Sequence, residues 1–467
     1  MKKLMICALA AGMLIMPMHI QAEETKDKGY ITIIEGEDWG PAVTKLVIPY
    51  TAGGQGDFQV TAVKKAVAST GEEINDQGEV LVNQVYRSDE TGNKSDDGNY
   101  TTIELTIHPD DTFTNPFYFD MEAFANSWAD VTYTITSKNG DTWKKEINRI
   151  KEGADMFDKG DHTYTDEEFG DITLQYANYS PKQDDKKNPL IIWLHGMGEG
   201  GEDPDLVLLG NKVTNLAKDP IQSYFEGAYV LAPQSPTFWL DNGTGSMTED
   251  GNSMYTRALM DTIDTYVKNN DDIDTERIYI GGCSNGGFMT MRMIMSYPEY
   301  FAAAYPICDA MYDAFITDED IQKIKHIPMW FTHASSDALA MVADTSIPTY
   351  ERLIEAGAPN VHFSLYDAVI DKSNQYKDAE GAPYMYNAHY SWIYTLNNDP
   401  KLDYEGEPVM IDNKPVTIFE WLSKQTKQKT DYVEPDFFDN YGILIGAFAV
   451  VAVIVGCTMI RGKKEKK

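Results

Sequence analysis

Residues 277–287 read Arg277-Ile278-Tyr279-Ile280-Gly281-Gly282-Cys283-Ser284-Asn285-Gly286-Gly287. An apolar, strand-like segment runs into a glycine-bracketed serine, and a helical-looking segment, 288–296, follows. Gly-x-Ser-x-Gly between a strand and a helix is typical of a nucleophile elbow, a turn so tight that the residues flanking the serine must be small. Such a turn exposes the hydroxyl of Ser284 and points N–H groups of the new helix at an anion above it. A glycine-rich turn with a bystander serine is the alternative, so the functional interpretation depends on partners for Ser284.

A second glycine-rich loop continues from the apolar strand 190–193 and reads Leu194-His195-Gly196-Met197-Gly198-Glu199-Gly200-Gly201. Its glycines let the backbone approach a reacting carbonyl, so we expect the N–H groups of Met197 and Asn285 to form an oxyanion hole. A phosphate-binding loop is the alternative, but no Gly-Lys-Ser/Thr follows.

A serine nucleophile needs a base and an orienting acid, both at the carboxyl ends of strands. Asp337 follows the predicted strand 329–333, and His389 lies between the last predicted sheet strand, 361–368, and a closing helix. The order Ser284, Asp337, His389 is the chain order that an α/β-hydrolase uses. We therefore predict these three residues as the catalytic triad.

Other acids and histidines compete for these roles. Asp344 is the fallback acid, and a solvated surface carboxylate is the usual interpretation for either aspartate because the chain holds 73 acidic residues. His195 is expected to shape the oxyanion loop, and His333 is expected to pack at a strand end.

The pattern of expected strands and helices along the chain predicts two folded domains. Residues 23–160 contain short Thr-, Val-, Ile- and Tyr-rich strands separated by turn clusters, which predicts an antiparallel, immunoglobulin-like sandwich. Its aromatic residues Phe117 and Phe119 are expected to pack in the core, with sugar binding as the alternative. Residues 161–426 alternate strands with helices, which predicts a mostly parallel sheet covered on both faces by helices.

Both ends of the chain carry apolar segments. Residues 1–22 have a basic head, an apolar run and a small residue at the end, typical of a secretory signal peptide. Residues 441–460 lack charge and span about 30 Å as a helix, the thickness of a bilayer core. The basic tail 461–467 then predicts a cytoplasmic C-terminus, with the domains outside the cell and a linker at 427–440.

The net charge limits which partners the protein can bind, and the positions of two cysteines limit its disulfides. The net charge of −34 argues against nucleic acid or anionic lipid as a target. No metal or cofactor is implied. Cys283 and Cys308 fall at the predicted ends of neighbouring strands, where one disulfide and two free buried thiols are equally compatible with the sequence.

Residues 161–426 resemble the secreted α/β-hydrolase esterases, also called predicted peptidases, which are similar to polyhydroxybutyrate depolymerase-like and feruloyl esterase-like enzymes. The resemblance rests on the two glycine-rich loops, on Ala232-Pro233-Gln234, on Ser335-Ser336-Asp337 and on His389-Tyr390-Ser391-Trp392. It implies Ser284, His389 and Asp337 as nucleophile, base and acid. Ala334 departs from the glycine common in relatives. The long stretch 371–387 is a second departure, expected to lie over the pocket.

The hypothesis is an extracellular, membrane-anchored serine hydrolase that cleaves small-molecule or polysaccharide-linked esters without a cofactor. A serine peptidase of prolyl oligopeptidase type is the first alternative, because the same triad cuts amides. A surface binding protein that has lost activity is the second.

Overall fold

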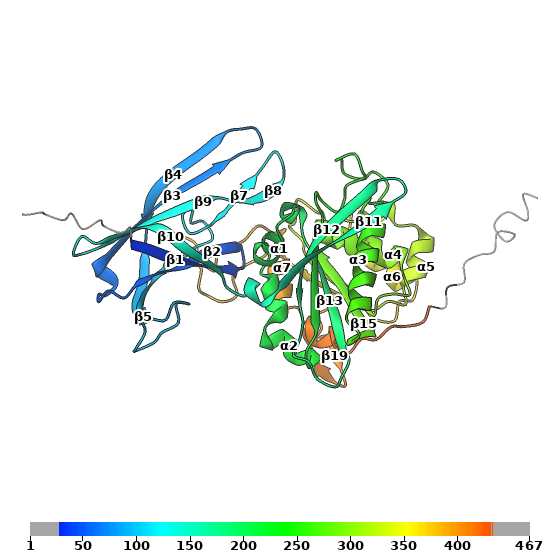
Figure 1. The fold of residues 1–467 in the computed structure, drawn as a ribbon. Coiled ribbons are helices and arrows are strands. Elements are labelled where there is room, and N and C mark those ends of the chain that lie inside the picture. Colours follow the sequence, from blue (N-terminus) through cyan, green and yellow to red (C-terminus); the bar gives the residue numbers. More distant parts are fainter. Residues whose placement is uncertain (1–27, 431, 433–467) are drawn as a thin grey trace, which may run out of the picture.

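The computed structural model describes residues 28–430 and 432, which form two domains lying side by side (Figure 1). Eight strands of the N-terminal domain form one hydrogen-bonded sheet in the order β4-β3-β9-β10-β1-β2-β6-β5. A separate hairpin of two strands completes this domain. The strands are β1 (Lys28–Glu37), β2 (Gly40–Pro49), β3 (Phe58–Val67), β4 (Glu73–Val80), β5 (Val82–Ser88), β6 (Tyr100–Leu105), β9 (Asp130–Ser137) and β10 (Thr142–Lys151), with β7 (Phe117–Asp120) and β8 (Ala125–Trp128) in the hairpin.

The N-terminal domain is a β-sandwich whose core is built from alternate residues of its strands. Tyr30 of β1 and Tyr133 of β9 meet inside the core, with ring centroids 6.2 Å apart, and the Tyr133 N–H donates to the Tyr30 hydroxyl at 2.9 Å. The expectation of purely antiparallel pairing was wrong at one place, because β1 and β10 run parallel. Alternating hydrophobicity shows which face of a strand is buried, but it carries no information on the direction of a partner far away in sequence.

The C-terminal domain contains a second eight-stranded sheet in the order β11-β12-β14-β13-β15-β16-β17-β18, parallel from β14 to β18. Its central strands are buried on both faces, as the continuous apolar runs in the sequence predict. The strands are β11 (Asp158–Asp166), β12 (Gly170–Tyr179), β13 (Asn188–Leu194), β14 (Tyr229–Gln234), β15 (Ile273–Cys283), β16 (Ala303–Ile307), β17 (Met329–Ala334) and β18 (Val361–Tyr366).

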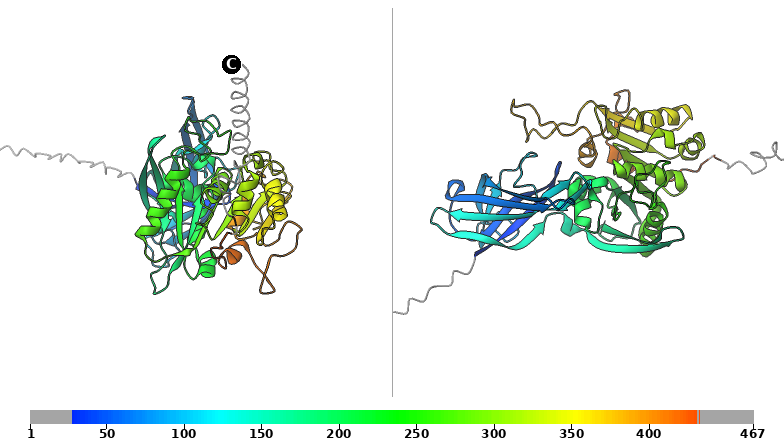
Figure 2. Two further views of the ribbon diagram at one scale, coloured as in Figure 1. Left: turned by 90° about the vertical axis from the view of Figure 1, so that its right-hand side faces the viewer. Right: turned by 90° about the horizontal axis from the view of Figure 1, so that it is seen from above.

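Helices cover both faces of this sheet, which defines an α/β-hydrolase-like fold (Figure 2). Leu190 and Ile192 of β13 pack with α3 to α6 on one face, whereas Ile191 and Trp193 pack with α1, α2, α7 and α8 on the other. This division follows from the two-residue repeat of a strand. The helices are α1 (Pro204–Gly210), α2 (Asp219–Phe225), α3 (Thr256–Asn269), α4 (Asn285–Ser296), α5 (Asp318–Ile324), α6 (Ser346–Glu355), α7 (Trp392–Leu396) and α8 (Ile418–Leu422).

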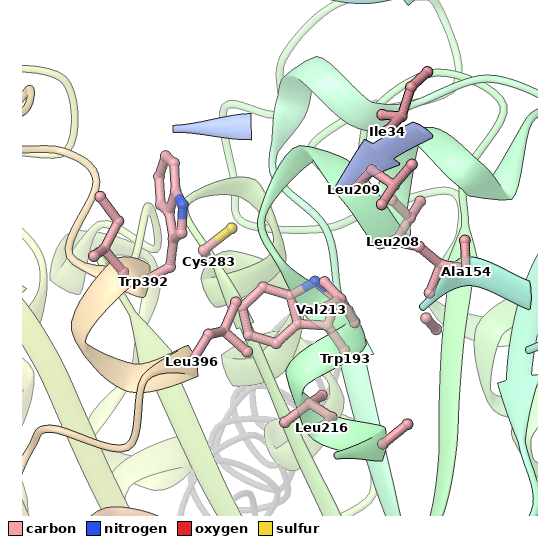
Figure 3. Close-up of a cluster of buried hydrophobic side chains, with 14 of the residues drawn as sticks. Ile34, Ala154, Trp193, Leu208, Leu209, Val213, Leu216, Cys283, Trp392 and Leu396 are labelled. Carbon is pink, nitrogen blue, oxygen red and sulfur yellow. The ribbon is translucent and has the colours of Figure 1, made fainter. Parts of the chain in front are cut away.

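The two domains share one apolar cluster at their junction (Figure 3). Ile34 of β1 lies in the same cluster as Leu208 and Leu209 of α1, and the cluster continues to Trp193 and Trp392 beneath the sheet. These side chains are fully or almost fully buried. Because separating the domains would expose this apolar surface to water, the cluster holds the N-terminal domain against the hydrolase domain.

The stretch 371–387 also joins the domains. Its Tyr384 hydroxyl donates to Oδ1 of Asp110 at 2.6 Å, and Tyr376 packs edge-on against Trp39 with ring centroids 4.6 Å apart. Both partners belong to the N-terminal domain, so this long loop lies between the domains.

The predictions for residues 1–22, 441–460 and 461–467, and most of the linker 427–440, lie outside the described residues and stay predictions. Within residues 28–430, none of the helices has the length and apolar character needed to cross a membrane.

Candidate active site

Ser284 sits at the turn between β15 and α4, with φ 56° and ψ −114°, a conformation that non-glycine residues rarely adopt. The flanking glycines explain how the turn fits. A Cβ on Gly282 would lie 2.2 Å from the carbonyl oxygen of Leu194, and one on Gly286 would lie 2.0 Å from the same atom. Only glycine therefore allows the elbow to rest on the end of β13, which brings Ser284 next to the loop that follows that strand.

That loop forms a single 3₁₀ turn at Met197–Glu199. His195 is fully buried behind it: its Nε2 accepts from the Ser235 N–H at 3.1 Å, so Nδ1 carries the proton and donates to the carbonyl of Gly196 at 2.6 Å. Burial lowers the pKa of His195 to about 4, which keeps the ring neutral. His195 thus fixes the loop backbone, in the structural role expected of it.

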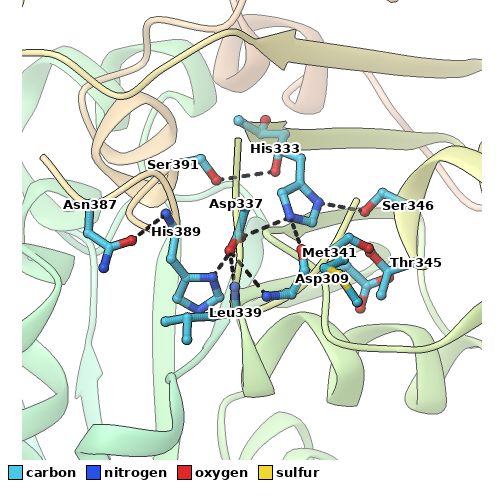
Figure 4. A network of polar contacts seen from close by, with 12 residues as sticks. Asp309, His333, Asp337, Leu339, Met341, Thr345, Ser346, Asn387, His389 and Ser391 are labelled. Carbon is cyan, nitrogen blue, oxygen red and sulfur yellow. Dashed lines mark hydrogen bonds and ion pairs between the residues drawn. The ribbon is translucent and has the colours of Figure 1, made fainter. Parts of the chain in front are cut away.

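Asp337 and His389 are in direct contact, although 52 residues separate them in sequence (Figure 4). Nδ1 of His389 donates to Oδ2 of Asp337 at 2.7 Å. The N–H groups of Leu339 and Ala340 donate to Oδ1 at 2.8 and 3.1 Å. Because a carboxylate only accepts, the proton on His389 resides on Nδ1, and Nε2 is left free to accept a proton.

A second histidine, His333, holds the other side of Asp337. Its Nε2 lies 3.1 Å from Oδ2 of Asp337 and 2.9 Å from the carbonyl of Ala340. Since both of these groups only accept, Nε2 carries the proton, and Nδ1 accepts from the hydroxyl of Ser346 at 3.0 Å. Burial alone would raise the pKa of Asp337, but the hydrogen bonds from His333 and His389 outweigh it and hold that pKa well below its usual range.

The sequence interpretation underestimated His333 as a residue that merely packs at a strand end. Its spacing of four residues from Asp337 across the end of β17 was the available signal. The fallback acid Asp344 is exposed, and within the described part of the chain no hydrogen bond or ion pair joins its carboxylate to a histidine.

Four of the predicted site residues line one cavity of about 680 Å³: Ser284, His389, Met197 and Asn285. Among the described residues no hydrogen bond joins His389 to Ser284. Catalytic hydrogen bonds of unliganded enzymes are often long and shorten only when substrate binds. The four residues therefore meet at one site, with Asp337 buried directly behind His389.

Glu199 also lines this cavity and was not predicted as part of the site. It is 6% exposed, and Oε1 accepts from Nδ2 of Asn126, which belongs to β8 of the N-terminal domain, at 2.9 Å. Burial raises the pKa of Glu199 to about 7. The carboxyl group is therefore largely protonated below neutral pH.

This raised pKa predicts a pH-dependent loss of stability. Between about pH 4.5 and 7 the folded state holds a proton on Glu199 that the unfolded state has released, so stability falls as the pH rises through this window. Glu199→Gln keeps an acceptor for Asn126 but cannot ionise. We expect the variant to be more stable than wild type at about pH 8 by up to about 3 kcal/mol, with the difference vanishing near pH 4, in urea unfolding curves. Glu202→Gln, an exposed neighbour, is the control, and equal pH profiles for Glu199→Gln and wild type would contradict the assignment.

Cys283 and Cys308 are both free and fully buried, which decides between the two states that the sequence left open. Burial raises the pKa of both thiols well above the usual value. Among residues 28–430, no cluster of three His, Cys, Asp or Glu side chains is arranged to hold a metal ion. That no cofactor is required stays a prediction.

The fold and the site define an α/β-hydrolase with an N-terminal sandwich domain, and two family matches agree with this class. Residues 29–148 match the esterase Ig-like N-terminal domain, and residues 255–377 match the prolyl oligopeptidase family. A thermostable esterase of known crystal structure is 25% identical with a TM-score of 0.65, over 86% of this chain and all of that one. Residues 29–148 are thus similar to the Ig-like domain of esterases, and residues 255–377 are similar to the prolyl oligopeptidase family.

Two curated relatives match part of this chain. A probable dipeptidyl-aminopeptidase B of Talaromyces marneffei is 26% identical over 265 residues, 49% of this chain and 27% of the relative. Poly(3-hydroxyalkanoate) depolymerase C of Paucimonas lemoignei is 27% identical over 150 residues, 30% of this chain and 32% of the relative. The chain thus spans about a quarter to a third of the length of the curated relatives it matches.

Proposed function

We propose that this protein is a serine hydrolase that cleaves carboxylic esters through an acyl-enzyme. Nε2 of His389 takes the hydroxyl proton of Ser284 while the serine oxygen attacks the ester carbonyl carbon. The N–H groups of Met197 and Asn285 stabilise the oxyanion. The bond to the alkoxide then breaks, His389 returns the proton to the leaving alcohol, and water hydrolyses the acyl-serine by the same route to release the acid.

The observation that carries the proposal is the convergence at one cavity of a partly buried elbow serine and a histidine hydrogen-bonded to a buried carboxylate. Asp337 accepts four hydrogen bonds, two of them from histidines, so it is held ionised and in a fixed orientation. This arrangement supports the role of an acid that orients the base and stabilises the imidazolium form during proton transfer.

A serine peptidase is the second candidate, favoured by the prolyl oligopeptidase match over residues 255–377 and by the dipeptidyl-aminopeptidase relative. The two candidates share the triad and differ in the leaving group, which is an alkoxide in one and an amine in the other. The structural likeness to an esterase along both domains favours ester cleavage.

The test compares ester and amide substrates that release the same acyl group, together with labelling by a fluorophosphonate probe. We expect wild-type protein to be labelled on the peptide that contains Ser284, and to turn over the ester roughly 10²-fold faster than the matched anilide. Faster cleavage of the amide would select the peptidase. Failure of the folded protein to be labelled at Ser284 would remove the enzyme proposal and leave a binding protein.

A further inference from the structure

The N-terminal domain supplies one wall of the candidate active site. Its β7–β8 hairpin lies against the predicted oxyanion loop, where a Cβ on Gly198 would come within 2.7 Å of Nδ2 of Asn126 and 3.6 Å of Cε2 of Phe119. The hairpin is also anchored at the end of β8, because Nε1 of Trp128 donates to Oδ2 of Asp203 at 2.8 Å. Its distance from Ser284 is therefore set by contacts with the hydrolase domain.

The tip of this hairpin presents apolar side chains to the cavity. Phe119, Met121 and Phe124 line it and are 42%, 67% and 48% exposed, and Phe119 and Phe124 pack edge-on with ring centroids 6.2 Å apart. Across the cavity, Met247 and Leu339 of the hydrolase domain are also more than half exposed. Apolar groups gathered in this way around a concave site mark a surface that gains free energy when a ligand covers it.

The polar groups of the cavity do not favour a charged ligand. Among the described residues that line it, none is Lys or Arg, and the acid present is Glu199, already hydrogen-bonded to Asn126. An anionic ligand would lose its hydration here without gaining a cation in exchange. The lining therefore suits an uncharged, apolar group.

We propose that the hairpin tip, residues 119–124, determines substrate specificity by binding an extended aliphatic chain of the ester. The substrate class is then uncharged esters of medium or long aliphatic acyl chains, and the N-terminal domain is part of the binding site. Methionine side chains at Met121 and Met247 adapt readily to a flexible chain. This inference rests on the proposed esterase function, which it deepens by naming the substrate class.

The test measures kcat/KM for p-nitrophenyl acetate, butyrate and octanoate. In wild type we expect kcat/KM to rise by up to about 4-fold for each acyl-chain methylene that becomes buried against the hairpin, the equivalent of about 0.8 kcal/mol. Phe124→Ser and Met121→Ser should each lower the octanoate-to-acetate ratio of kcat/KM by roughly 3- to 10-fold. The matched control is Leu81→Ser. Leu81 lies in the same domain as Met121 and is 69% exposed, close to the 67% of Met121, but it does not line the cavity. It should leave the ratio unchanged.

The outcomes distinguish failure of this inference from failure of the proposed serine hydrolase function. If the folded wild type neither reacts with a fluorophosphonate nor hydrolyses any of the three esters, the serine hydrolase proposal fails and this inference fails with it. If labelling and turnover are normal but both hairpin variants change the three esters equally, the hairpin does not select chain length and the inference alone is overturned. A selective loss on octanoate, absent from Leu81→Ser, supports it.

Discussion

Ser284→Ala is expected to lower kcat for ester hydrolysis by roughly 10⁶-fold and to abolish fluorophosphonate labelling. The hydroxyl lost is that of the proposed nucleophile, whereas the Met197 and Asn285 N–H groups and the cavity itself remain. We therefore expect substrate binding to persist while the acyl-enzyme no longer forms. Single-turnover kinetics and intact-protein mass after labelling check both parts.

The stability of this variant should stay close to that of wild type, because alanine keeps the Cβ of serine at the same positive φ and the hydroxyl of Ser284 makes no hydrogen bond among the described residues. The matched control is Ser336→Ala, a serine that is exposed and donates to the carbonyl of Asp367 at 2.8 Å. Full labelling of Ser284→Ala would show that the nucleophile lies elsewhere.

Asp337→Asn is expected to lower kcat by roughly 10⁴-fold while the site keeps its shape. An asparagine oxygen can replace only one carboxylate oxygen, and the amide group would place N–H donors against either the two histidines or the two backbone N–H groups. His389 would then lose the partner that keeps its proton on Nδ1, so Nε2 would no longer be free to accept a proton from Ser284. Pre-steady-state acylation rates measure the loss directly.

The companion variant is Asp344→Asn, which alters the fallback acid. Asp344 is exposed, and in the described part of the chain no hydrogen bond or ion pair joins its carboxylate to His389, so its change should leave kcat within about twofold of wild type, as for a surface substitution. The reverse result, with Asp344→Asn inactive and Asp337→Asn active, would reassign the acid. Thermal unfolding of both variants distinguishes loss of chemistry from loss of the folded state.

Much of the hydrolase domain could be predicted because its signals are local. The apolar run 190–194 became β13, buried on both faces, and residues 277–287 became the end of β15 and the elbow. Strand burial depends on a two-residue repeat, and the tight turn depends on glycines next to the serine. Both signals can therefore be recognised from residues that are neighbours in the sequence. Asp337 and His389 were found by their position after strands, because parallel strands end at a common edge.

The N-terminal domain was harder to interpret, and the hairpin shows why. Phe117 and Phe119 were both expected in the core. Both side chains line the cavity, but Phe117 is buried and packs on Trp128 with ring centroids 4.7 Å apart, whereas Phe119, two residues on, is 42% exposed. Both lie on the same side of β7, so strand periodicity cannot separate them; Phe117 is covered because Trp128 of the neighbouring strand packs on it.

The order of residues along the chain is enough to predict the succession of strands and helices, the tight turn at Ser284 and the order of the candidate triad. Each of these depends on residues adjacent in the chain or on the common edge of a parallel sheet. Three further features emerge from the packed fold: His333 is the second partner of Asp337, both buried cysteines are free, and the N-terminal domain reaches the site through Asn126 and Phe119. These contacts depend on how separately folded surfaces pack against each other, and no local pattern along the chain specifies that packing.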